Sequence, residues 1–462
     1  MNVLLISCYE LGHQPFNLAS PATHLRDAGF DVQCRDLAVE TLNEEQVKQA
    51  DLVALSTPMH TALRIARRAA KRVRDLNPDC HICFYGLYAG MHADYLLDGN
   101  GRREVDSVIG GEFERPMVEL AQSLTNGGQV RAEGVITREH SGSTSFERQN
   151  FLLPSRESLP SLSQYARLEI GKDLYLTGYV EASRGCAHRC LHCPITPVYN
   201  GRVRIVQKDV VLQDIKQLVK LGAEHITFGD PDFLNGVKHS MNIVREMHEK
   251  YPHLRFDFTA KVEHILEHHR LFPELNELGC IFMVSAVELL NDTILGYLDK
   301  GHSRSDVEKA VQITREAGIS MRPSLMPFTP WTSIEDILDI LEFVEEFELY
   351  DQIDPVQYSI RLLIPPGSSI LSLPEIRPFL KGFDQTRFVF EWEHPDPKMD
   401  ELPKQLADVA EQATSEQEDR FDTYLRIREA VLRNAGNVQR IGTIPAFDRK
   451  QYAPRLTEDW FC

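Results

Sequence analysis

The sequence lacks any long apolar run, and this absence excludes one class of protein. No stretch of its 462 residues approaches the ~20 consecutive apolar residues that a membrane-spanning helix needs. The first residues, MNVLLISCYELGHQPF, also lack the basic region and long apolar stretch of a signal peptide. We therefore expect a cytoplasmic protein without a membrane partner, in which Asn2–Ser7 forms a buried first strand.

Positive charge is also scarce. There are 50 Lys and Arg residues against 68 Asp and Glu residues, which gives a formal net charge of -18. Because binding to nucleic-acid phosphates depends on clustered Lys and Arg, this balance argues against a nucleic-acid partner. The nine cysteines are odd in number and scattered over a long chain, so a disulfide framework is not expected either.

The glycine-rich turn GxGxxG is missing after the first strand, where the sequence reads CYELGHQPF, so an ordinary dinucleotide site is not expected. Residues 1–125 instead alternate short apolar segments with helical patterns, which predicts a parallel sheet covered by helices on both faces. The expected strands are Val3–Ser7, Asp31–Leu37, Asp51–Thr57, His81–Gly86 and Ser107–Gly110. The expected helices are Leu18–Ala28, Met59–Leu76, Ala89–Leu97 and Glu112–Leu124.

A second series of strands and helices follows a Gly- and Pro-punctuated linker at 126–176. Six strand–helix units over 177–387 predict a partial, open (βα)6 barrel of the TIM type, whose carboxyl strand ends carry chemistry. Its expected strands are Gly178–Ala182, His225–Gly229, Arg255–Thr259, Cys280–Val287, Ser320–Met326 and Val356–Leu363. A mainly helical extension at 388–462 contains one long expected helix, Pro403–Ala435.

One group of cysteines is tightly spaced. Cys186, Cys190 and Cys193 follow the first strand of the second series. Cysteines at i, i+4 and i+7 could form one face of a core helix. Gly185 and Pro194 argue against that interpretation, because they bracket the segment with residues that end helices.

Two metal sites remain compatible with the three cysteines. Structural zinc is almost always four-coordinate, and His188 or His192 could supply the fourth ligand. Three thiolates also suit a four-iron cluster in which one iron stays open for another ligand. The surrounding sequence motif favours the iron–sulfur cluster over zinc.

CxxxCxxC in the loop after the first barrel strand resembles the radical S-adenosylmethionine (radical SAM) enzymes. The resemblance implies that Cys186, Cys190 and Cys193 bind a [4Fe–4S] cluster whose open iron binds S-adenosylmethionine. An electron from the cluster would then split that cofactor and yield a 5′-deoxyadenosyl radical. It also implies an electron donor such as flavodoxin or ferredoxin.

The same resemblance assigns residues to S-adenosylmethionine. His192 would lie against the adenine, and the loop with Gly229, Asp230 and Asp232 would meet the amino end, where carboxylates can accept ammonium protons. This loop departs from the family's usual Gly-Gly-Glu. Asp and Pro also favour a capped turn, which is the structural alternative.

Two further strand ends carry polar residues. Ser285 and Glu288 close an apolar strand, where a carboxylate would be costly inside a core, and the resemblance implies that Glu288 holds the ribose hydroxyls. Glu288 could instead belong to the start of the next helix. Arg322 on the fifth strand either faces the cofactor or pairs with a neighbouring carboxylate.

The first domain resembles the cobalamin-binding domain found ahead of many radical SAM enzymes. The Asp-x-His-x-x-Gly motif that supplies a histidine to cobalt is absent, although His13 lies in the corresponding loop. Small residues at strand ends would let the corrin approach the backbone. The implied cobalamin residues are His13, Ser56, Thr57, Gly86, Gly110, Gly111 and Glu112. A domain that only docks on the barrel is the alternative.

Together these features predict an α/β chain with a doubly wound, flavodoxin-like sheet, a partial barrel and a helical extension. Cobalamin ahead of a radical barrel suggests methyl transfer to carbon of a small-molecule or peptide substrate. The alternatives are a cobalamin-independent cyclase or group-transfer enzyme, and a non-catalytic cobalamin or metal sensor. Methylthio transfer is disfavoured, because the other cysteines lack the spacing for a second cluster.

The ending Arg455–Cys462 and the segments Met1–Pro15, Ser183–Val206, Phe228–Leu234 and Lys300–His302 resemble radical SAM proteins named for a Cys-Sec-Ala-Glu-Pro or Cys-Cys-Ala-Glu-Pro tail. The sequence ends at the position where that tail would begin. A shortened end and a UGA selenocysteine codon read as stop are the two hypotheses. Reading the next codons of the source DNA decides between them.

Overall fold

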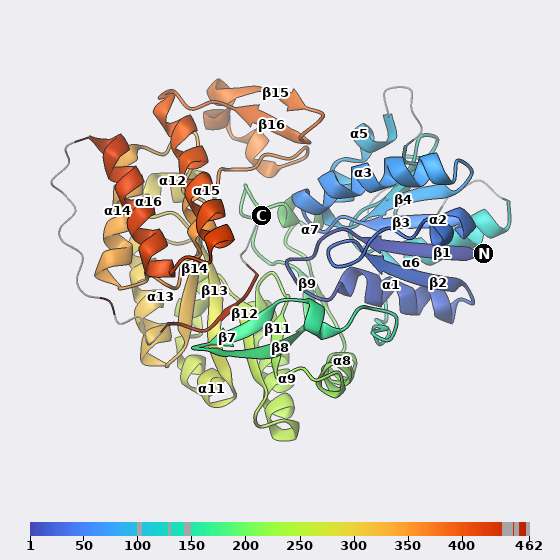
Figure 1. Cartoon of the computed structure of the whole chain (residues 1–462), viewed down its shortest axis with the longest axis horizontal. Helices are drawn as coiled ribbons and strands as arrows, with labels where there is room; N and C mark the ends of the chain where they lie inside the picture. Colours follow the sequence, from blue (N-terminus) through green and yellow to red (C-terminus); the bar gives the residue numbers. More distant parts are fainter. Residues whose placement is uncertain are drawn as a thin grey trace.

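The computed structural model describes residues 1–98, 104–127, 130, 132–142, 149–436, 447 and 452–458. Two parallel sheets lie next to each other, one built by the first domain and one by the barrel (Figure 1). Both predicted sheets are therefore confirmed. The last four residues of the tail motif, 459–462, lie outside the described residues.

The first sheet has the strand order β2-β1-β3-β4-β5-β6. Its first five strands are parallel, and the sixth runs antiparallel to β5. Every residue of β3 is buried, which explains why its sequence reads as a continuous apolar run. The strands are β1 (Asn2–Ser7), β2 (Asp31–Asp36), β3 (Leu52–Ser56), β4 (His81–Tyr85), β5 (Ser107–Ile109) and β6 (Val135–Thr137).

Helices cover both faces of this sheet, and each face has its own core. One core joins Leu18 of α1 (Phe16–Asp27) to Met117 of α6 (Glu114–Thr125). The other contains side chains of α3 (His60–Leu76), α4 (Leu87–Met91) and α5 (Ala93–Asp98), with α2 (Glu44–Gln49) beside α3. The order 2-1-3-4-5 and the two covered faces define the doubly wound, flavodoxin-like architecture.

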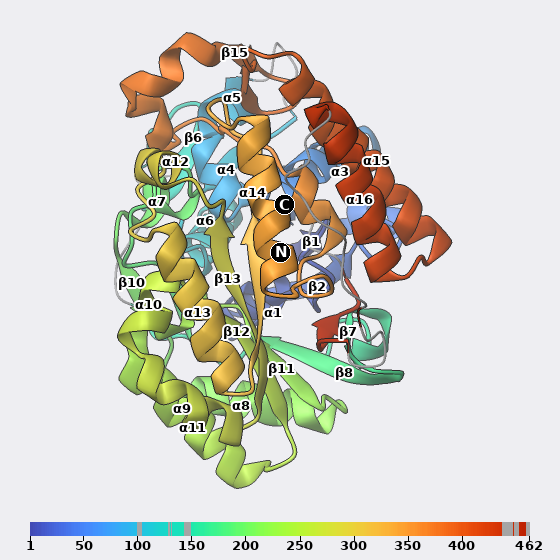
Figure 2. The ribbon, with the colours of Figure 1, turned by 90° about the vertical axis from the view of Figure 1, so that its left-hand side faces the viewer.

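The second sheet has the order β14-β13-β12-β11-β8-β7-β17. Five of its strands are parallel: β8 (Asp173–Val180), β11 (His225–Phe228), β12 (Arg255–Thr259), β13 (Cys280–Glu288) and β14 (Ser320–Leu325). Figure 2 shows α13 and α14 in front of the strands, on the outer side of the sheet. The helices are α8 (Lys208–Lys220), α9 (Val237–Lys250), α10 (Val262–Glu267), α11 (Phe272–Glu277), α12 (Asp292–Tyr297), α13 (Arg304–Glu316) and α14 (Ile334–Glu346).

The predicted sixth barrel strand, Val356–Leu363, is wrong. Pro355–Ser359 forms a short 3-10 helix, and only one bridge, between Phe328 and Arg361, continues the sheet. Pro355 fixes φ for the first turn of a helix and cannot donate to a strand ladder, which accounts for the difference. The barrel arc therefore has five full strands, and the sixth unit contributes only that bridge.

The predicted long helix Pro403–Ala435 is two helices, α15 (Lys398–Glu416) and α16 (Arg420–Ala435). Gln417 between them has a left-handed φ of 52°, and Asp419 caps α16 by accepting the amide protons of Phe421 and Asp422. A hairpin of β15 (Leu380–Asp384) and β16 (Val389–Trp392) precedes them, so the expected domain boundary at 387 falls within its turn.

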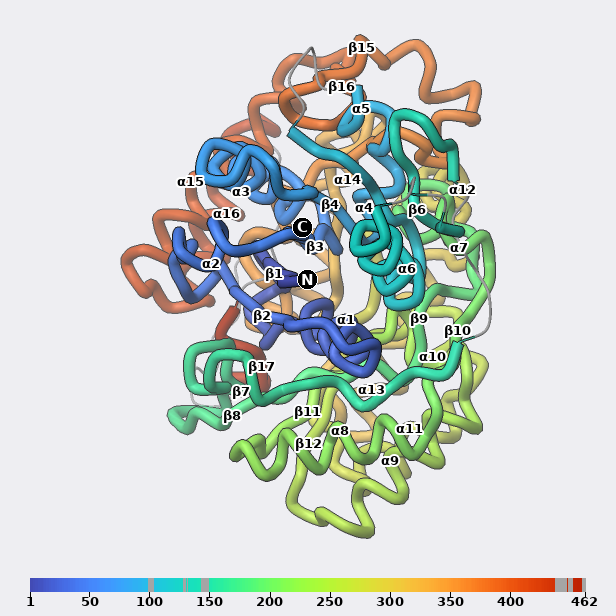
Figure 3. Tube along the Cα trace, turned by 90° about the vertical axis from the view of Figure 1, so that its right-hand side faces the viewer, coloured from blue at the N-terminus to red at the C-terminus, as the bar shows by residue number. Residues whose placement is uncertain are grey.

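The expected linker 126–176 is structured where it is described. It contributes β6 to the first sheet and β7 (Arg167–Ile170) to the second. Figure 3 shows the connection running across the foot of the first domain, past α1. The amide of Ser155 donates to the carbonyl oxygen of Ala19, and the hydroxyl of Thr23 donates to that of Leu153. The connection is therefore bound to the first domain along its length.

Candidate active site

The three cysteines lie in a loop between β9 (Ser183–Gly185) and α7 (Ile195–Tyr199), and the segment 186–194 is not helical. The core-helix interpretation is therefore wrong. Gly185 has a φ of 74°, and a methyl group there would lie 2.3 Å from the carbonyl oxygen of Arg202. The turn into the loop therefore requires glycine.

The three thiols belong to the same loop and are not joined by disulfide bonds. All three are free, and burial raises the pKa of Cys193 to about 12, with charge on Cys190 and Cys186 adding to the effect. In the described part of the chain, these three sulfurs do not form a group within 4.8 Å of one another. Thiolates around one tetrahedral zinc ion would lie roughly 3.8 Å apart. The wider spacing fits an iron–sulfur cube better than a single zinc ion.

Glu288 forms a buried ion pair beside the cysteine loop. Its carboxylate lies 2.9 Å from Nζ of Lys300 and 3.2 Å from Nε2 of His192. Burial opposes ionisation of Glu288, but Lys300 and His192 hold its pKa well below the ordinary value. The structure thus brings together two residues that the sequence assigned to S-adenosylmethionine, and it adds Lys300.

The position of Glu288 is unusual for its residue type. It has a φ of 66° at a point where the register between β13 and β14 slips. Such a left-handed conformation is uncommon for a residue with a long side chain and persists where surrounding contacts fix it. The slip turns the carboxylate toward the cysteine loop. Ser285, on the same strand, has a buried hydroxyl oxygen without a hydrogen-bond partner in the structure.

The loop after β11 packs against the cysteine loop. Asp230 accepts hydrogen bonds from the Ala182 amide at 2.9 Å and the Ser183 hydroxyl at 2.5 Å. Burial raises the pKa of Asp230 to about 7. A methyl group at Gly229 would collide with the ring of Tyr179. The Asp230 carboxylate therefore fastens this loop to the start of the cluster segment.

Asp232 follows in the same loop and is fully buried. It caps a short 3-10 helix by accepting the amide proton of Leu234 at 3.0 Å, and it also accepts that of Lys261 at 3.2 Å. The capped turn expected as an alternative is therefore present. Both aspartates are turned toward backbone amides of the protein.

A cavity of about 280 Å³ lies between the barrel strands and the first domain. His13 and Leu11 line it from the first domain, and Gly229 and Asp230 line it from the end of β11. Burial lowers the pKa of His13 to about 4, so this imidazole is neutral at physiological pH. His13 packs against the ring of Tyr179 at a centroid distance of 4.8 Å.

Arg322 also lines this cavity, but its charge is already matched. Its guanidinium donates to Asp354 at 2.5 Å and to the carbonyl oxygen of Asp351 at 3.3 Å. The expected pairing of Arg322 with a neighbouring carboxylate is present, and Arg322 also lines the cavity. Glu458 of the C-terminal segment closes another part of the wall and accepts a hydrogen bond from Tyr9 at 2.8 Å.

The carboxyl edge of the first sheet carries unpaired polar atoms. In the structure, the buried hydroxyl oxygens of Ser7 and Ser56 and one carboxylate oxygen of Glu10 have no hydrogen-bond partner. Thr57 instead donates to the carbonyl oxygen of Tyr85. Because buried polar atoms normally have partners, these orphaned atoms fit a polar ligand such as cobalamin at this edge.

The expected glycines lie at the same edge. Gly86 and Gly111 have positive φ values of 106° and 70°. A methyl group at Gly90 would lie 2.8 Å from Cα of Gly110, so the backbones approach closely here. Glu112 points toward the barrel and accepts a hydrogen bond from Tyr199 at 2.9 Å. Its carboxylate therefore joins the domains.

Arg184, two residues before Cys186, is the centre of the domain interface. Its guanidinium contacts Glu112 at 3.2 Å, Glu114 at 2.7 Å and Glu181 at 2.7 Å. The guanidinium carbon also lies 5.1 Å from the centre of the Phe113 ring. No role was assigned to Arg184 from the sequence, and Lys300 was named only within the segment Lys300–His302. A cation beside Gly185 at a strand end was the available signal for Arg184, whereas Lys300 follows helix α12 and carries no such signal.

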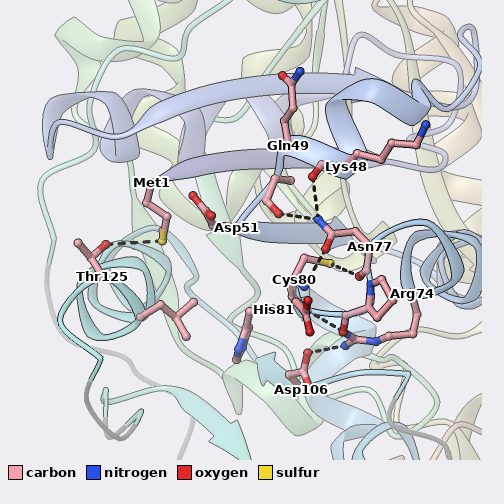
Figure 4. A pocket seen from close by; sticks show the side chains of 14 residues that line it. Met1, Lys48, Gln49, Asp51, Arg74, Asn77, Cys80, His81, Asp106 and Thr125 are labelled. Atoms are coloured by element: carbon pink, nitrogen blue, oxygen red, sulfur yellow. Dashed lines mark hydrogen bonds and ion pairs between the residues drawn. The ribbon is translucent and has the colours of Figure 1, made fainter.

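A second cavity, of about 750 Å³, lies at the opposite edge of the first sheet (Figure 4). Asn77 donates to the carbonyl oxygens of Val47 and Ala50 there, and Arg74 pairs with Asp106 at 2.6 Å. The polar groups drawn are thus largely satisfied by one another. This cavity faces away from the cysteine loop, at the amino ends of the strands.

Two family models match the chain. The Radical SAM superfamily model matches residues 180–344, and the B12 binding domain model matches residues 2–121. Among the described residues, no helix combines the length and apolarity that crossing a membrane requires.

Curated relatives and solved structures agree with these models. Hopanoid C-3 methylase of Methylococcus capsulatus is 24% identical over 325 residues, which cover 69% of this chain and 62% of the relative. The chain thus spans less than two thirds of that relative's length. An uncharacterized methyltransferase of Pyrococcus horikoshii is 23% identical over 66% of this chain and 67% of its own length.

The structural similarity shows the fold. The cobalamin-dependent radical enzyme OxsB superposes with a TM-score of 0.71 at 14% identity, over 90% of this chain and 67% of its own. The methyltransferase TsrM from Kitasatospora setae superposes with a TM-score of 0.62 at 17% identity, over 75% and 71%. The family implies a [4Fe–4S] cluster, S-adenosylmethionine and cobalamin as cofactors. The chain belongs to the radical SAM enzymes that carry a B12-binding domain ahead of the barrel.

Proposed function

We propose that the chain is a cobalamin-dependent methyltransferase that acts on carbon of a small-molecule or peptide substrate. The supporting observation is the shared cavity, which His13 lines from the first domain and Gly229 and Asp230 line from the barrel. Ile195, just after the cysteine loop, and Leu11 and His13, in the loop after β1, also line this cavity, so groups bound at these two loops would lie next to it. The methyltransferase relatives favour this reaction over a cyclisation.

Bound together, the cluster and S-adenosylmethionine supply a radical, and cobalamin carries a methyl group. The thiols of Cys186, Cys190 and Cys193 would hold the cluster. Glu288 would hold hydroxyl groups of S-adenosylmethionine, and its ionised form is stabilised by Lys300 before any ligand arrives. Because the Glu288 carboxylate is already ionised and held in place, it does not have to change its charge or orientation when S-adenosylmethionine binds.

The protein's remaining task is to exclude water and fix orientation. The cavity is small and its wall includes Phe228, Phe282 and Val284, so a substrate would displace most of the water. A neutral His13 adds no charge near the first-domain edge. A cavity of about 280 Å³ favours a small substrate, or one residue of a peptide, over a large polycyclic one.

We further propose that the chain works in the cytoplasm with flavodoxin or ferredoxin as its reductant, and that it has no nucleic-acid partner. Eight of the nine cysteines lie in the described residues and all eight are free, which supports a reducing compartment. The subfamily named for its Cys-Sec-Ala-Glu-Pro or Cys-Cys-Ala-Glu-Pro tail is also proposed here. The support is that Arg455, Leu456 and Glu458 of the corresponding segment line the cavity.

Anaerobic purification with cobalamin supplied, followed by product analysis, tests the proposal. The wild-type protein should contain iron and corrin and should form 5′-deoxyadenosine and S-adenosylhomocysteine in the presence of a reductant. The control, with Cys186, Cys190 and Cys193 all changed to Ala, should lose the thiolate-to-iron absorbance and 5′-deoxyadenosine but keep the corrin. Corrin-free protein that still cleaves S-adenosylmethionine would support the cobalamin-independent alternative. If iron and corrin are both bound but neither 5′-deoxyadenosine nor S-adenosylhomocysteine is formed, the result would support the hypothesis of a sensor.

A further inference from the structure

Three side chains from three different segments meet beside the cysteine loop, and the arrangement differs from the cofactor role that the sequence suggested for Asp232. His188 belongs to the loop itself, Asp232 follows β11, and His264 lies on α10. Oδ2 of Asp232 lies 2.9 Å from Nδ1 of His264 and 3.8 Å from Nε2 of His188. One ligand atom from each residue can be chosen so that all three lie within 4.8 Å of one another.

The two imidazole nitrogens are buried and lack hydrogen-bond geometry. Among the described residues, Nε2 of His188 and Nδ1 of His264 make no hydrogen bond of good geometry, although both face the same carboxylate oxygen; Nδ1 of His264 lies at ion-pair distance from it. Oδ1 of Asp232 accepts the amide proton of Leu234, and Oδ2, the oxygen that faces both imidazoles, also accepts the amide proton of Lys261 at 3.2 Å. Buried polar atoms without good hydrogen bonds require an explanation, and a bound ion is one that suits two imidazoles and a carboxylate.

The charges around this group suit a cation. Oε2 of Glu263 lies 3.5 Å from Nδ1 of His188 and 3.3 Å from Nζ of Lys261. Two carboxylates, Asp232 and Glu263, therefore face one ammonium, and, against the opposing effect of burial, Asp232 favours a positive charge at this point by raising the pKa of His264. A divalent ion bound by the three side chains would supply that positive charge in place of a proton on His264. Glu263 is also exposed enough to leave one side of the group open to water.

Both measured distances from Asp232 need little adjustment to suit a metal ion, and the two imidazoles lie within 4.8 Å of each other. Nitrogen and oxygen ligands of zinc lie about 2.0–2.2 Å from the metal, so they are roughly 3–3.5 Å apart. The spacing of 2.9 Å between His264 and Asp232 already fits. The 3.8 Å to His188 requires a shift of well under ~1 Å.

We propose that His188, Asp232 and His264 bind one divalent transition-metal ion of the zinc or iron(II) class, separate from the [4Fe–4S] cluster. Two imidazoles and one carboxylate with an open position form the donor set that these ions take in proteins. The ion ties the cysteine loop to the loop after β11 and to α10. This metal site goes beyond the proposed function, since none of the three cysteines is among its ligands.

Zinc is the probe for the test. The wild-type holoprotein, reconstituted anaerobically with iron and sulfide so that the cysteines are occupied, is equilibrated with Zn²⁺ and desalted. Zinc and iron are then counted by mass spectrometry. We expect one zinc per chain in the wild type, and at least a tenfold lower zinc content in His264→Ala and in His188→Ala, with unchanged iron in the His264 variant.

His268→Ala is the matched control, because His268 is a neighbouring histidine on the same side whose ring lies 5.7 Å from that of His264. It should keep its zinc. Absorption at the zinc edge should show only nitrogen and oxygen neighbours near ~2.0–2.1 Å, whereas zinc in the cysteine loop would show sulfur near ~2.3 Å.

A wild type that keeps no zinc, equal zinc in His264→Ala, or a sulfur shell would each overturn the proposal. The first of these results would leave an ion pair between Asp232 and His264 as the role of the group. Failure of iron to load would count against the proposed function instead. The zinc measurement would then be made on the variant with Cys186, Cys190 and Cys193 changed to Ala, in which zinc cannot bind to the cysteine loop through sulfur.

Discussion

Replacing Arg184 by Met tests the account of the domain interface. The change keeps an apolar side chain of similar length but removes the only cation that the contacts above place among Glu112, Glu114 and Glu181. Side-chain exposure is 7% for Arg184 and 0% for Glu114, so water cannot replace the lost partner. Removing one member of a buried ion pair costs about 3–5 kcal/mol, because the other charge stays buried and unpaired.

The size of the loss should depend on pH. In the wild type, burial raises the pKa of Glu114, but Arg184 overcomes this effect and lowers it to about 2. Without Arg184, burial, the largest effect on Glu114, is opposed only by the smaller effects of Ser20 and His24, so we expect the folded-state pKa of the carboxyl to rise above its unfolded value. The variant's deficit should therefore be small in acid, where the carboxyl is protonated, and should grow as pH rises toward neutrality.

Urea unfolding followed by circular dichroism, at neutral pH and near pH ~5, measures both effects. Arg245→Met is the matched control. Arg245 also makes two contacts to a carboxylate, at 2.6 and 2.9 Å to Glu274, but its side chain is 48% exposed. Its loss should cost less than ~1 kcal/mol. The reasoning would be refuted if Arg184→Met were within ~1 kcal/mol of the wild type at neutral pH.

Three further changes test individual contacts. Burial raises the pKa of Glu10 to about 8, so the protonated carboxyl favours the folded state and stability falls as pH rises through that value. In Glu10→Gln, the melting temperature should therefore change less between pH ~5 and ~9 than in the wild type. An unchanged dependence of the melting temperature on pH would contradict the raised pKa. Glu288→Gln should leave Lys300 unpaired, cost about 3 kcal/mol and weaken S-adenosylmethionine binding at least ~10-fold in equilibrium dialysis. The double variant with Lys300→Met should regain stability but not affinity, and recovered affinity would argue against a ligand role. Gly12→Ala places a methyl group 2.7 Å from Glu458 at a φ of 69°. The clash should loosen the contact with the C-terminal segment, so proteolysis of that segment should be severalfold faster than in the wild type. A rate of proteolysis equal to that of the wild type would show that the segment does not dock against Gly12.

Elements whose signal is local were predictable from the sequence. The strand Leu52–Ser56 is an unbroken apolar run because both of its faces are buried. The cysteine loop was found from spacing, with Gly185 and Pro194 marking its ends. Each of these features depends on residues that are near neighbours in the chain.

The features that sequence reasoning missed depend on distant partners or on backbone conformation. The carboxylate of Glu112, a predicted cobalamin residue, contacts Arg184, which is 72 residues away in the chain, and no local pattern indicates that contact. The alternation around Val356–Leu363 looked like a strand, yet Pro355 begins a 3-10 helix there. Gln417 interrupts a helical pattern by adopting a left-handed conformation, which cannot be predicted from the sequence because Gln rarely adopts it.

The contacts of Arg184 also set an order of events during synthesis. Glu114 leaves the ribosome 70 residues before its cation does. Until Arg184 arrives, this carboxylate has to stay in water or take up a proton, and the edge of the first domain cannot close. Closure of the interface then orders the segment that leads into Cys186, so the ligand loop reaches its final shape only after the two domains have docked. Iron insertion is therefore expected as the last step of maturation, on a chain whose domains have already joined.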